Sequence, residues 1–172
     1  MTKTVLNLAL AGCLAVTTGF AATKTAKVTL NDAAGKAVGT ALITDKSGSG
    51  VTVKLEVKGL PPGEHALHFH QTAKCEGPAF TTAGGHFNPA GKKHGMQNPD
   101  GPHAGDMNNF TVKPNGTAKV TISDANVNLG DGPNSLYSNG GTALMIHAAA
   151  DDMKSDPAGN AGARIACGTI TK

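Results

Sequence analysis

Segments in which apolar and polar residues alternate mark the chain from residue 27 onward. In the clearest, 51–57, valine and leucine at odd positions are separated by Thr, Lys and Glu. Successive side chains of a strand point to opposite faces, so this period of two predicts a strand with one buried face. Comparable segments bounded by turn residues predict strands at 27–30, 38–44, 64–71, 109–113, 117–123, 142–148 and 164–171.

Glycine and proline separate these segments. The break at 59–63 contains two prolines, which cannot donate to a strand ladder, and 45–50 is a polar turn. Pro114-Asn115-Gly116 predicts the turn of a hairpin. About eight short strands, with no helix of normal length and no internal repeat, predict one all-β domain built as an antiparallel sandwich or barrel.

Three segments without strand periodicity interrupt the pattern, at 72–105, 124–141 and 149–163. An aperiodic loop of more than about 15 residues is uncommon in a compact domain unless it is functional. The chain has 172 residues, which fits one domain. Its formal net charge of +3 is small and scattered along the sequence, so it does not favour nucleic acid or an anionic membrane as a partner.

The N-terminus has the features of an export signal. Lys3 precedes a mostly apolar run that ends in small residues near Ala21 and Ala22. This predicts a signal peptide over 1–22 and a mature domain over 23–172, in a periplasm or outside the cell. The apolar run is too short and interrupted for a membrane span. Cys13 follows a small pair, as in a lipoprotein signal, so it is either discarded or the site of a lipid anchor.

Two cysteines remain in the mature domain, Cys75 and Cys167. In an oxidising compartment an even pair predicts one disulfide. It would close a long loop, for which the chain-entropy model gives roughly 4–5 kcal/mol. Arg164 is three residues before Cys167, so the disulfide would bring it close to the long loop. Without that link, Arg164 is an ordinary surface arginine.

Six of the seven histidines lie between His65 and Asp106, which points to a metal site. His68 and His70 are two apart on a predicted strand, so both rings project from one face and can chelate a metal. They can also be two surface histidines. His147 ends an apolar run and is either a buried core residue or a further ligand beside them. A site made only of imidazoles suits copper.

A second set on the long loop combines three imidazoles with a carboxylate: His86, His94, His103 and Asp106. Zinc takes nitrogen and oxygen ligands of this kind in closed tetrahedral sites. The alternative is a group of solvated loop histidines beside an acid. That alternative requires a long polar loop to become ordered with nothing bound.

These motifs resemble the copper/zinc superoxide dismutase family, bacterial secreted type, over essentially the whole mature chain. The matching motifs are HALHFH at 65–70, GGHFNP at 84–89, HG at 94–95, HAGD at 103–106 and GNAGARIACG at 159–168. The resemblance implies an eight-stranded antiparallel Greek-key barrel or flattened sandwich with two long functional loops.

The resemblance also implies one copper and one zinc per chain. The implied copper ligands are His68, His70, His86 and His147. The implied zinc ligands are His86, His94, His103 and Asp106. His86 would then bridge the two metals through its two ring nitrogens.

Further roles follow from the same resemblance. Asp151 would link a copper ligand to a zinc ligand, and His65 would pack behind the copper site. Cys75 and Cys167 would form the disulfide. The implied reaction converts superoxide to oxygen and hydrogen peroxide through alternate reduction and oxidation of copper.

In that reaction His86 would release copper and take up a proton. Arg164 would guide the anion, with help from Lys154. Three features depart from the family pattern: Ala66 replaces a glycine, Ala158 stands where many relatives carry a threonine, and the loop 149–163 is short. They affect the steering charges and leave the metal ligands in place. A non-catalytic copper/zinc-binding domain is the alternative function, and a monomer and a homodimer are both compatible with the sequence.

Overall fold

The computed structural model describes residues 22–46 and 50–172. Residues 1–21 of the predicted signal peptide, with Cys13, lie outside these residues, as does part of the turn predicted at 45–50. Within the described chain, no helix is both long enough and apolar enough to span a membrane.

The described residues form strands joined by turns and loops, with two single 3₁₀ turns, Thr81–Ala83 and Ser138–Gly140. The strands are β1 Lys24–Asp32, β2 Ala37–Asp45, β3 Val51–Lys58, β4 Gly63–His65, β5 Leu67–His70, β6 Phe110–Val112, β7 Thr117–Asp124, β8 Thr142–His147 and β9 Arg164–Ile170.

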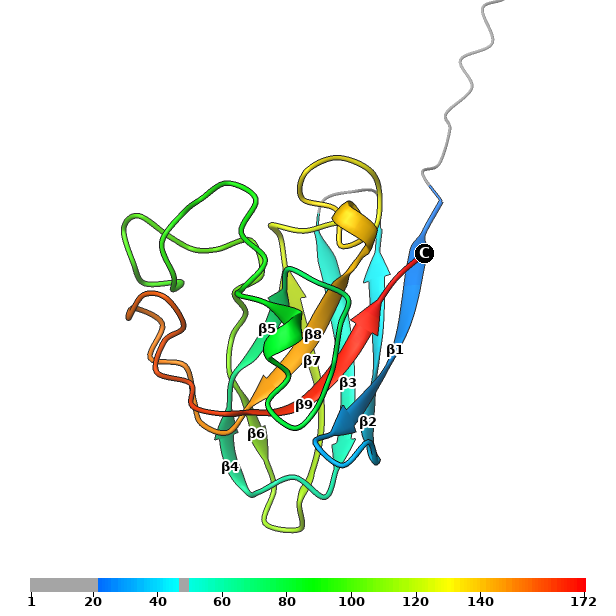
Figure 1. Ribbon diagram of the computed structural model, residues 1–172, viewed down its shortest axis with the longest axis vertical. Helices are drawn as coiled ribbons and strands as arrows, with labels where there is room; N and C mark the ends of the chain where they lie inside the picture. Colours follow the sequence, from blue (N-terminus) through cyan, green and yellow to red (C-terminus); the bar gives the residue numbers. More distant parts are fainter. Residues whose placement is uncertain (1–21, 47–49) are drawn as a thin grey trace, which may run out of the picture.

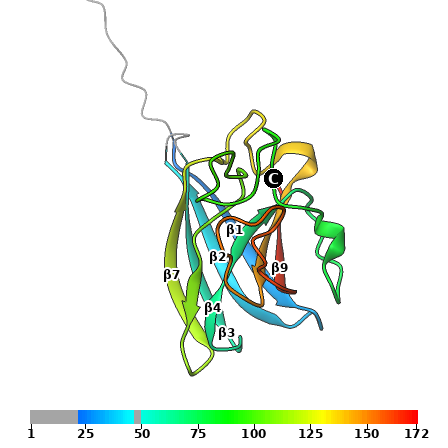
Figure 2. The ribbon, with the colours of Figure 1, turned by 90° about the vertical axis from the view of Figure 1, so that its left-hand side faces the viewer.

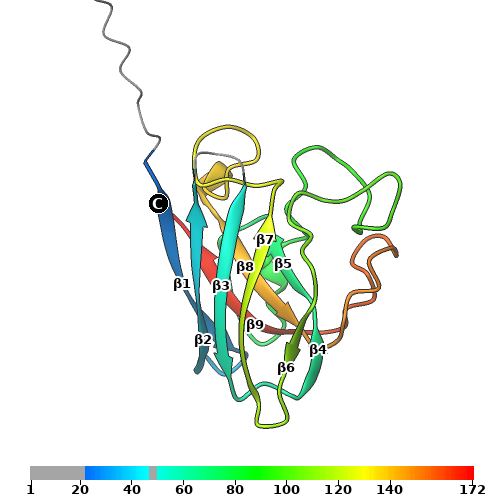
Figure 3. The same ribbon diagram turned by 180° about the vertical axis from the view of Figure 1, so that it is seen from behind.

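Seven strands form one curled antiparallel sheet in the order β5-β8-β9-β1-β2-β3-β7, and β4 pairs with β6. β1, β2, β3 and β7 make one face of the molecule, and β5, β8 and β9 lie on the opposite face (Figures 1 and 3). The first and last strands, β1 and β9, are neighbours in the middle of this sheet. The predicted all-β antiparallel barrel or flattened sandwich is confirmed.

Alternation along the strands builds the core. In β3 every odd position is buried and the even positions face outward, as predicted. Val28 and Leu30 of β1 and Leu144 and Ile146 of β8 add to the same core between the two faces. The hairpin at 114–116 also forms, because the N–H of Gly116 donates to the carbonyl of Lys113.

The strand predicted at 64–71 divides at Ala66. His65 pairs with Phe110 of β6, whereas Leu67 pairs with Ile146 of β8. The N–H of Ala66 donates to the carbonyl of Ala149 in a loop, not to either strand (2.9 Å). The chain therefore passes from one sheet to the other at this residue.

The first part of the long loop, predicted to be aperiodic, has a small apolar core of its own. Phe80 and Ala83 pack on Ala143 and Met145, the residues of β8 that face away from the main core. The Cys75–Cys167 disulfide, predicted from the cysteine count, ties this segment to β9. This second core buries β8 on both faces, which explains its uninterrupted apolar sequence.

Candidate metal centre

Strand β5 carries the two histidines that the sequence placed on one strand face. His68 and His70 are completely buried and lie opposite Met145 and Ala143 of β8. Phe69, between them, points the other way into the main core. The period of two thus separates the apolar side chain from the two imidazoles.

The histidine-bearing loop lies along the free edge of β5. The N–H of Phe69 donates to the carbonyl of Gly105, and the N–H of Phe87 donates to the carbonyl of Phe69 (2.9 and 2.8 Å). These bonds place His86 and Asp106 directly beside the strand histidines. Figure 2 looks onto this side of the molecule, where the loops 85–105 and 149–163 meet.

Four buried imidazoles form the first group, with one ring nitrogen of each within 4.8 Å of the others: His68, His70, His86 and His147. They come from β5, from the long loop and from the end of β8. The structure thus brings His147 to the strand pair, where sequence alone also allowed an isolated core histidine.

A second buried group has the same compactness and consists of His86, His94, His103 and Asp106. His86 belongs to both groups. Its Nδ1 lies 2.9 Å from Asp106 Oδ1 in the second group, which leaves Nε2 toward the first. The described residues therefore place eight ligand positions on seven side chains.

In the first group, the ring nitrogens that point away from the centre are held by oxygen acceptors. The contacts are His68 Nε2 to Asp151 Oδ2 (2.8 Å), His70 Nδ1 to Gly84 O (2.9 Å) and His147 Nδ1 to Gly162 O (3.2 Å). Each of these oxygens accepts a hydrogen bond, so the N–H hydrogen of each ring must be on the nitrogen that faces the oxygen. The inward nitrogens then carry lone pairs, as a metal ligand must.

The inward nitrogens have no adequate partner among the residues that the structure describes. His68 Nδ1 and His86 Nε2 are buried without any hydrogen bond. His70 Nε2 faces His147 Nε2 at 3.4 Å, so two acceptor nitrogens point at each other. Burying unpaired polar atoms costs free energy, and a cation among them removes that cost. The residues therefore fit a metal bound by nitrogen.

Burial keeps three of these rings neutral. It lowers the pKa of His70 to about 2 and that of His147 to about 3, with neighbouring imidazoles adding to the effect. It also lowers the pKa of His86 to about 4, although the Asp106 carboxylate opposes this shift. Neutral imidazoles do not have to lose a proton before they bind a metal.

The Asp106 carboxylate is at the centre of the second group. Its Oδ1 lies 3.1 Å from His94 Nδ1 and 3.4 Å from His103 Nδ1. Its Oδ2 accepts the backbone N–H of Gly95 and of His103, both at 2.9 Å. Burial alone would raise the pKa of Asp106, but hydrogen bonds from three histidines outweigh it and hold the pKa far below its usual value.

Asp151 contacts a histidine in each of the two groups. Its Oδ2 contacts His68 Nε2 and its Oδ1 contacts His94 Nε2 at 3.0 Å. Burial lowers the pKa of His94, but the hydrogen bonds to Asp106 and Asp151 outweigh burial and raise it to about 9. One carboxylate thus orients a ring in each group.

Two residues that position Asp151 were not found from the sequence. Asn109 donates from Nδ2 to the carbonyl of Asp151 and accepts its N–H through Oδ1, both at 2.9 Å. Gly159 has φ +62°, and a Cβ there would overlap the Asp151 carboxylate. The glycine belongs to a motif used for the resemblance, whereas nothing in the sequence distinguished Asn109 from other loop asparagines.

Arg164 is anchored beside the first group. Its Nη1 donates to the carbonyl of Phe80 (2.7 Å), and its Nη2 donates to the carbonyl of Gly84 (2.6 Å). The latter oxygen also accepts from His70 Nδ1. Arg164 lines an open hollow with Pro78, Ala79, Gly162 and Ala163. Lys154 does not line this hollow.

His65 lies behind the first group and is 1% exposed. Its Nδ1 is 2.8 Å from the carbonyl of His147, and its Nε2 is 2.8 Å from the carbonyl of Pro61. The His65 ring therefore connects the backbone of His147 to the turn before β4.

Comparisons with known proteins agree with this centre. Residues 37–170 match the family model for copper/zinc superoxide dismutase (SODC). A Cu-Zn superoxide dismutase 2 from Aquifex aeolicus (strain VF5) is 48% identical over 168 residues, which cover 96% of this chain and 98% of the relative.

Solved structures give the same result. A mutant of a SOD-like protein from Bacillus subtilis superposes with a TM-score of 0.82 at 37% identity, over 85% of this chain and 97% of that one. The Cu/Zn superoxide dismutase from Brucella abortus gives 0.70 at 27% identity, over 86% and 99%. The chain therefore belongs to the copper/zinc superoxide dismutase family.

Proposed function

We propose that the protein is a superoxide dismutase that holds one copper and one zinc ion. The residues that would hold copper are His68, His70, His86 and His147, and those that would hold zinc are His86, His94, His103 and Asp106. The observation that carries this proposal is that two compact ligand sets share one imidazole, beside an anchored arginine.

The reaction converts two superoxide anions and two protons to one O₂ and one H₂O₂. When bound, copper supplies a one-electron redox couple, and zinc supplies a fixed charge without redox chemistry. His86 Nε2 faces the copper set and is the atom at which this ring can hold a proton beside the substrate. The Arg164 guanidinium supplies a positive charge that attracts the small anion.

The supporting residues keep this arrangement rigid. Asp151, Gly84 and Gly162 hold the three other rings of the copper set with their lone pairs inward. Asp106 holds His94 at Nδ1, and Asp151 holds it at Nε2. Ligands held in place before binding do not lose conformational freedom when the metal enters.

The test is superoxide consumption by protein reconstituted with copper and zinc. Catalysis is expected for the wild type, and His147→Ala should lose both copper and activity while keeping zinc. Metal analysis should find one copper and one zinc per chain. Full occupancy of both metals without superoxide consumption would instead support a non-catalytic metal-binding domain.

We also propose that the protein is exported to a periplasm or the cell exterior, with a signal over 1–22 and the enzyme domain over 23–172. The Cys75–Cys167 disulfide supports this, because such bonds persist in oxidising compartments. Mass spectrometry of the mature N-terminus is the measurement. Cleavage near Ala22 is expected; a lipidated N-terminal Cys13 would show export with a lipid anchor, and an intact Met1 would contradict export.

A further inference from the structure

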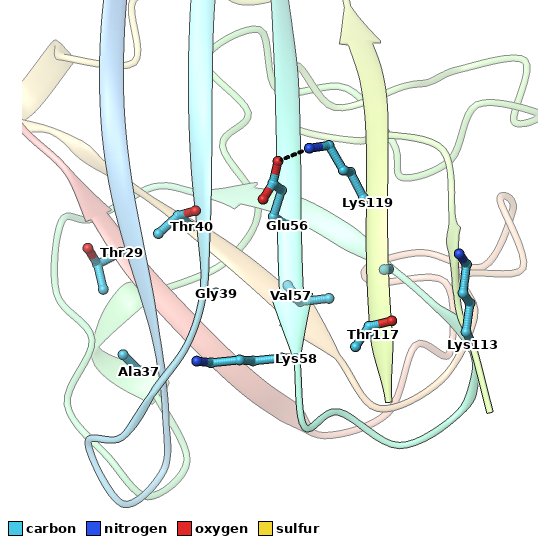
Figure 4. Close-up of a pocket in the computed structure, with 11 residues that line it drawn as sticks. Thr29, Ala37, Gly39, Thr40, Glu56, Val57, Lys58, Lys113, Thr117 and Lys119 are labelled. Atoms are coloured by element: carbon cyan, nitrogen blue, oxygen red, sulfur yellow. Dashed lines mark ion pairs between the residues drawn. The ribbon is translucent and has the colours of Figure 1, made fainter. Parts of the chain in front are cut away.

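A hollow of about 520 Å³ lies on the outer face of β1, β2, β3 and β7 and is unconnected with the metal centre. Figure 4 shows Lys58, Lys113 and Lys119 around it, together with Thr40 and Thr117, which also line it. Of these lysines, Lys119 pairs with Glu56 at 2.6 Å. Small side chains leave the hollow open.

The strand registers extend this positive charge across the sheet. Lys27 of β1, Leu42 of β2 and Lys54 of β3 are paired in one row, and both lysines are exposed. We call Lys27, Lys54, Lys58, Lys113 and Lys119 the basic sheet face. Glu56 is the one carboxylate among the outward-facing residues that pair across these four described strands. The face is therefore strongly positive.

Hydroxyl groups occupy most of the remaining outward positions. Thr25, Thr44, Thr52 and Ser123 form an unbroken row across all four strands. Thr40 and Thr117 continue the hydroxyl surface into the hollow. Such a face combines ammonium groups for anions with hydroxyls that exchange hydrogen bonds with sugar hydroxyls.

We propose that the basic sheet face is a docking surface for an acidic polysaccharide. Its ammonium groups would pair with sulfate or carboxylate groups of the polymer, and its threonines would contact the sugar rings. The metal-site loops lie at one side of the sheet in Figure 3, so a polymer on this face leaves the hollow beside Arg164 open.

Other occupants fit the face less well. None of its outward positions is aromatic, so bases of a nucleic acid have no stacking partner. Leu42 is its one large apolar side chain and is half-buried between lysines, which gives a membrane little to insert. A second copy related by a twofold axis would place like charges opposite each other.

The test uses the full, metal-loaded protein on immobilised dextran sulfate, with neutral dextran and phosphatidylglycerol vesicles as comparison probes. Wild-type protein should bind dextran sulfate at low salt, ignore neutral dextran and elute as salt shortens the range of the charges. Lys54→Gln/Lys58→Gln should weaken binding at least about tenfold. It should leave superoxide consumption unchanged, because both lysines are remote from the centre.

The matched control is Lys74→Gln/Lys92→Gln, which removes two exposed lysines from the long loop. Binding that is unchanged in the control and lost in the sheet variant supports the proposal. Equal weakening in both variants would mean that net charge alone is responsible, and would overturn it. So would absence of binding to dextran sulfate, or tighter binding to the vesicles than to the polymer.

Discussion

At the scale of single residues, Asp124 is a buried acid outside the metal centre. It is 4% exposed, its Oδ1 accepts the N–H of Asn126 at 2.8 Å, and its Oδ2 has no hydrogen-bond partner among the described residues. Burial raises its pKa to about 7, and the negative charge of Asp106 contributes to the same shift. The folded protein therefore keeps a proton on Asp124 that the unfolded chain loses near pH 4.

Asp124→Asn should change how stability depends on pH. In the wild type, this group stabilises the fold fully below pH 4, and its contribution falls as pH rises from about 4 to about 7. Asparagine keeps the acceptor and cannot ionise, so it should stabilise the protein at pH 8 by roughly 4 kcal/mol and change little at pH 4. Guanidinium unfolding of metal-free wild type and variant at both pH values measures this. A difference independent of pH would contradict it.

Arg164 belongs to the same scale, because in the proposed mechanism its charge attracts the substrate directly. Arg164→Glu should lower the superoxide consumption rate at least about tenfold at low ionic strength, and less at high salt, because it reverses the local field. Initial rates across a salt series measure the effect. Lys58→Glu makes the same charge change on the remote sheet and should leave the rate nearly unchanged. A rate unaffected by Arg164→Glu would remove Arg164 from the mechanism.

At the scale of elements, the loop 149–163 holds the long loop that carries the proposed zinc ligands in place. Asp156 Oδ1 accepts the backbone N–H of His94 at 2.8 Å, and its Oδ2 pairs with Lys93 at 3.2 Å. The N–H of Gln97 also donates to the carbonyl of Met153. Asp156 thus controls the position of His94, which is a proposed zinc ligand.

Asp156→Ala should weaken zinc binding about tenfold, as loss of a residue that orients metal ligands commonly does. Asp156→Asn keeps the oxygen that accepts the His94 N–H, so it should lose less zinc affinity. Competition with a zinc chelator gives the affinities. Asp152→Ala is the control, because the hydrogen bonds of that exposed carboxylate stay within its own loop. Equal zinc loss in both alanine variants would refute the assignment to Asp156.

At the scale of the molecule, the Cys75–Cys167 disulfide spans 92 positions and fastens the second apolar core to β9. Phe80, whose carbonyl accepts from Arg164, belongs to that core. The disulfide therefore supports both the global fold and the position of the arginine.

Cys75→Ser/Cys167→Ser should lower the free energy of unfolding by about 4–5 kcal/mol, the chain-entropy value for a loop of this length. Guanidinium unfolding of the metal-free protein separates this loss from any loss of metal. Reduced wild-type protein is the matched comparison and should show the same decrease. A loss below about 1 kcal/mol would show that the second core holds the loop without the covalent bond.

The sequence predicted the parts of the fold that depend on local geometry. Alternation in 51–57 identified β3. The two-residue spacing of His68 and His70 placed both on one side of β5. It did not predict that 64–71 divides at Ala66, because its apolar pattern continues through that residue. The division depends on which distant strands supply the hydrogen bonds.

By itself, the sequence determined the strand faces, the histidine and carboxylate sets and the one possible pairing of the mature cysteines. Side-chain orientation and residue chemistry are properties of neighbouring positions, so they can be read locally. Tertiary structure alone decided that His147 joins the strand histidines and that Asn109 holds Asp151. It also gathered lysines that are scattered in sequence onto one sheet face. Those outcomes depend on contacts between residues far apart in the chain, which only the folded backbone brings together.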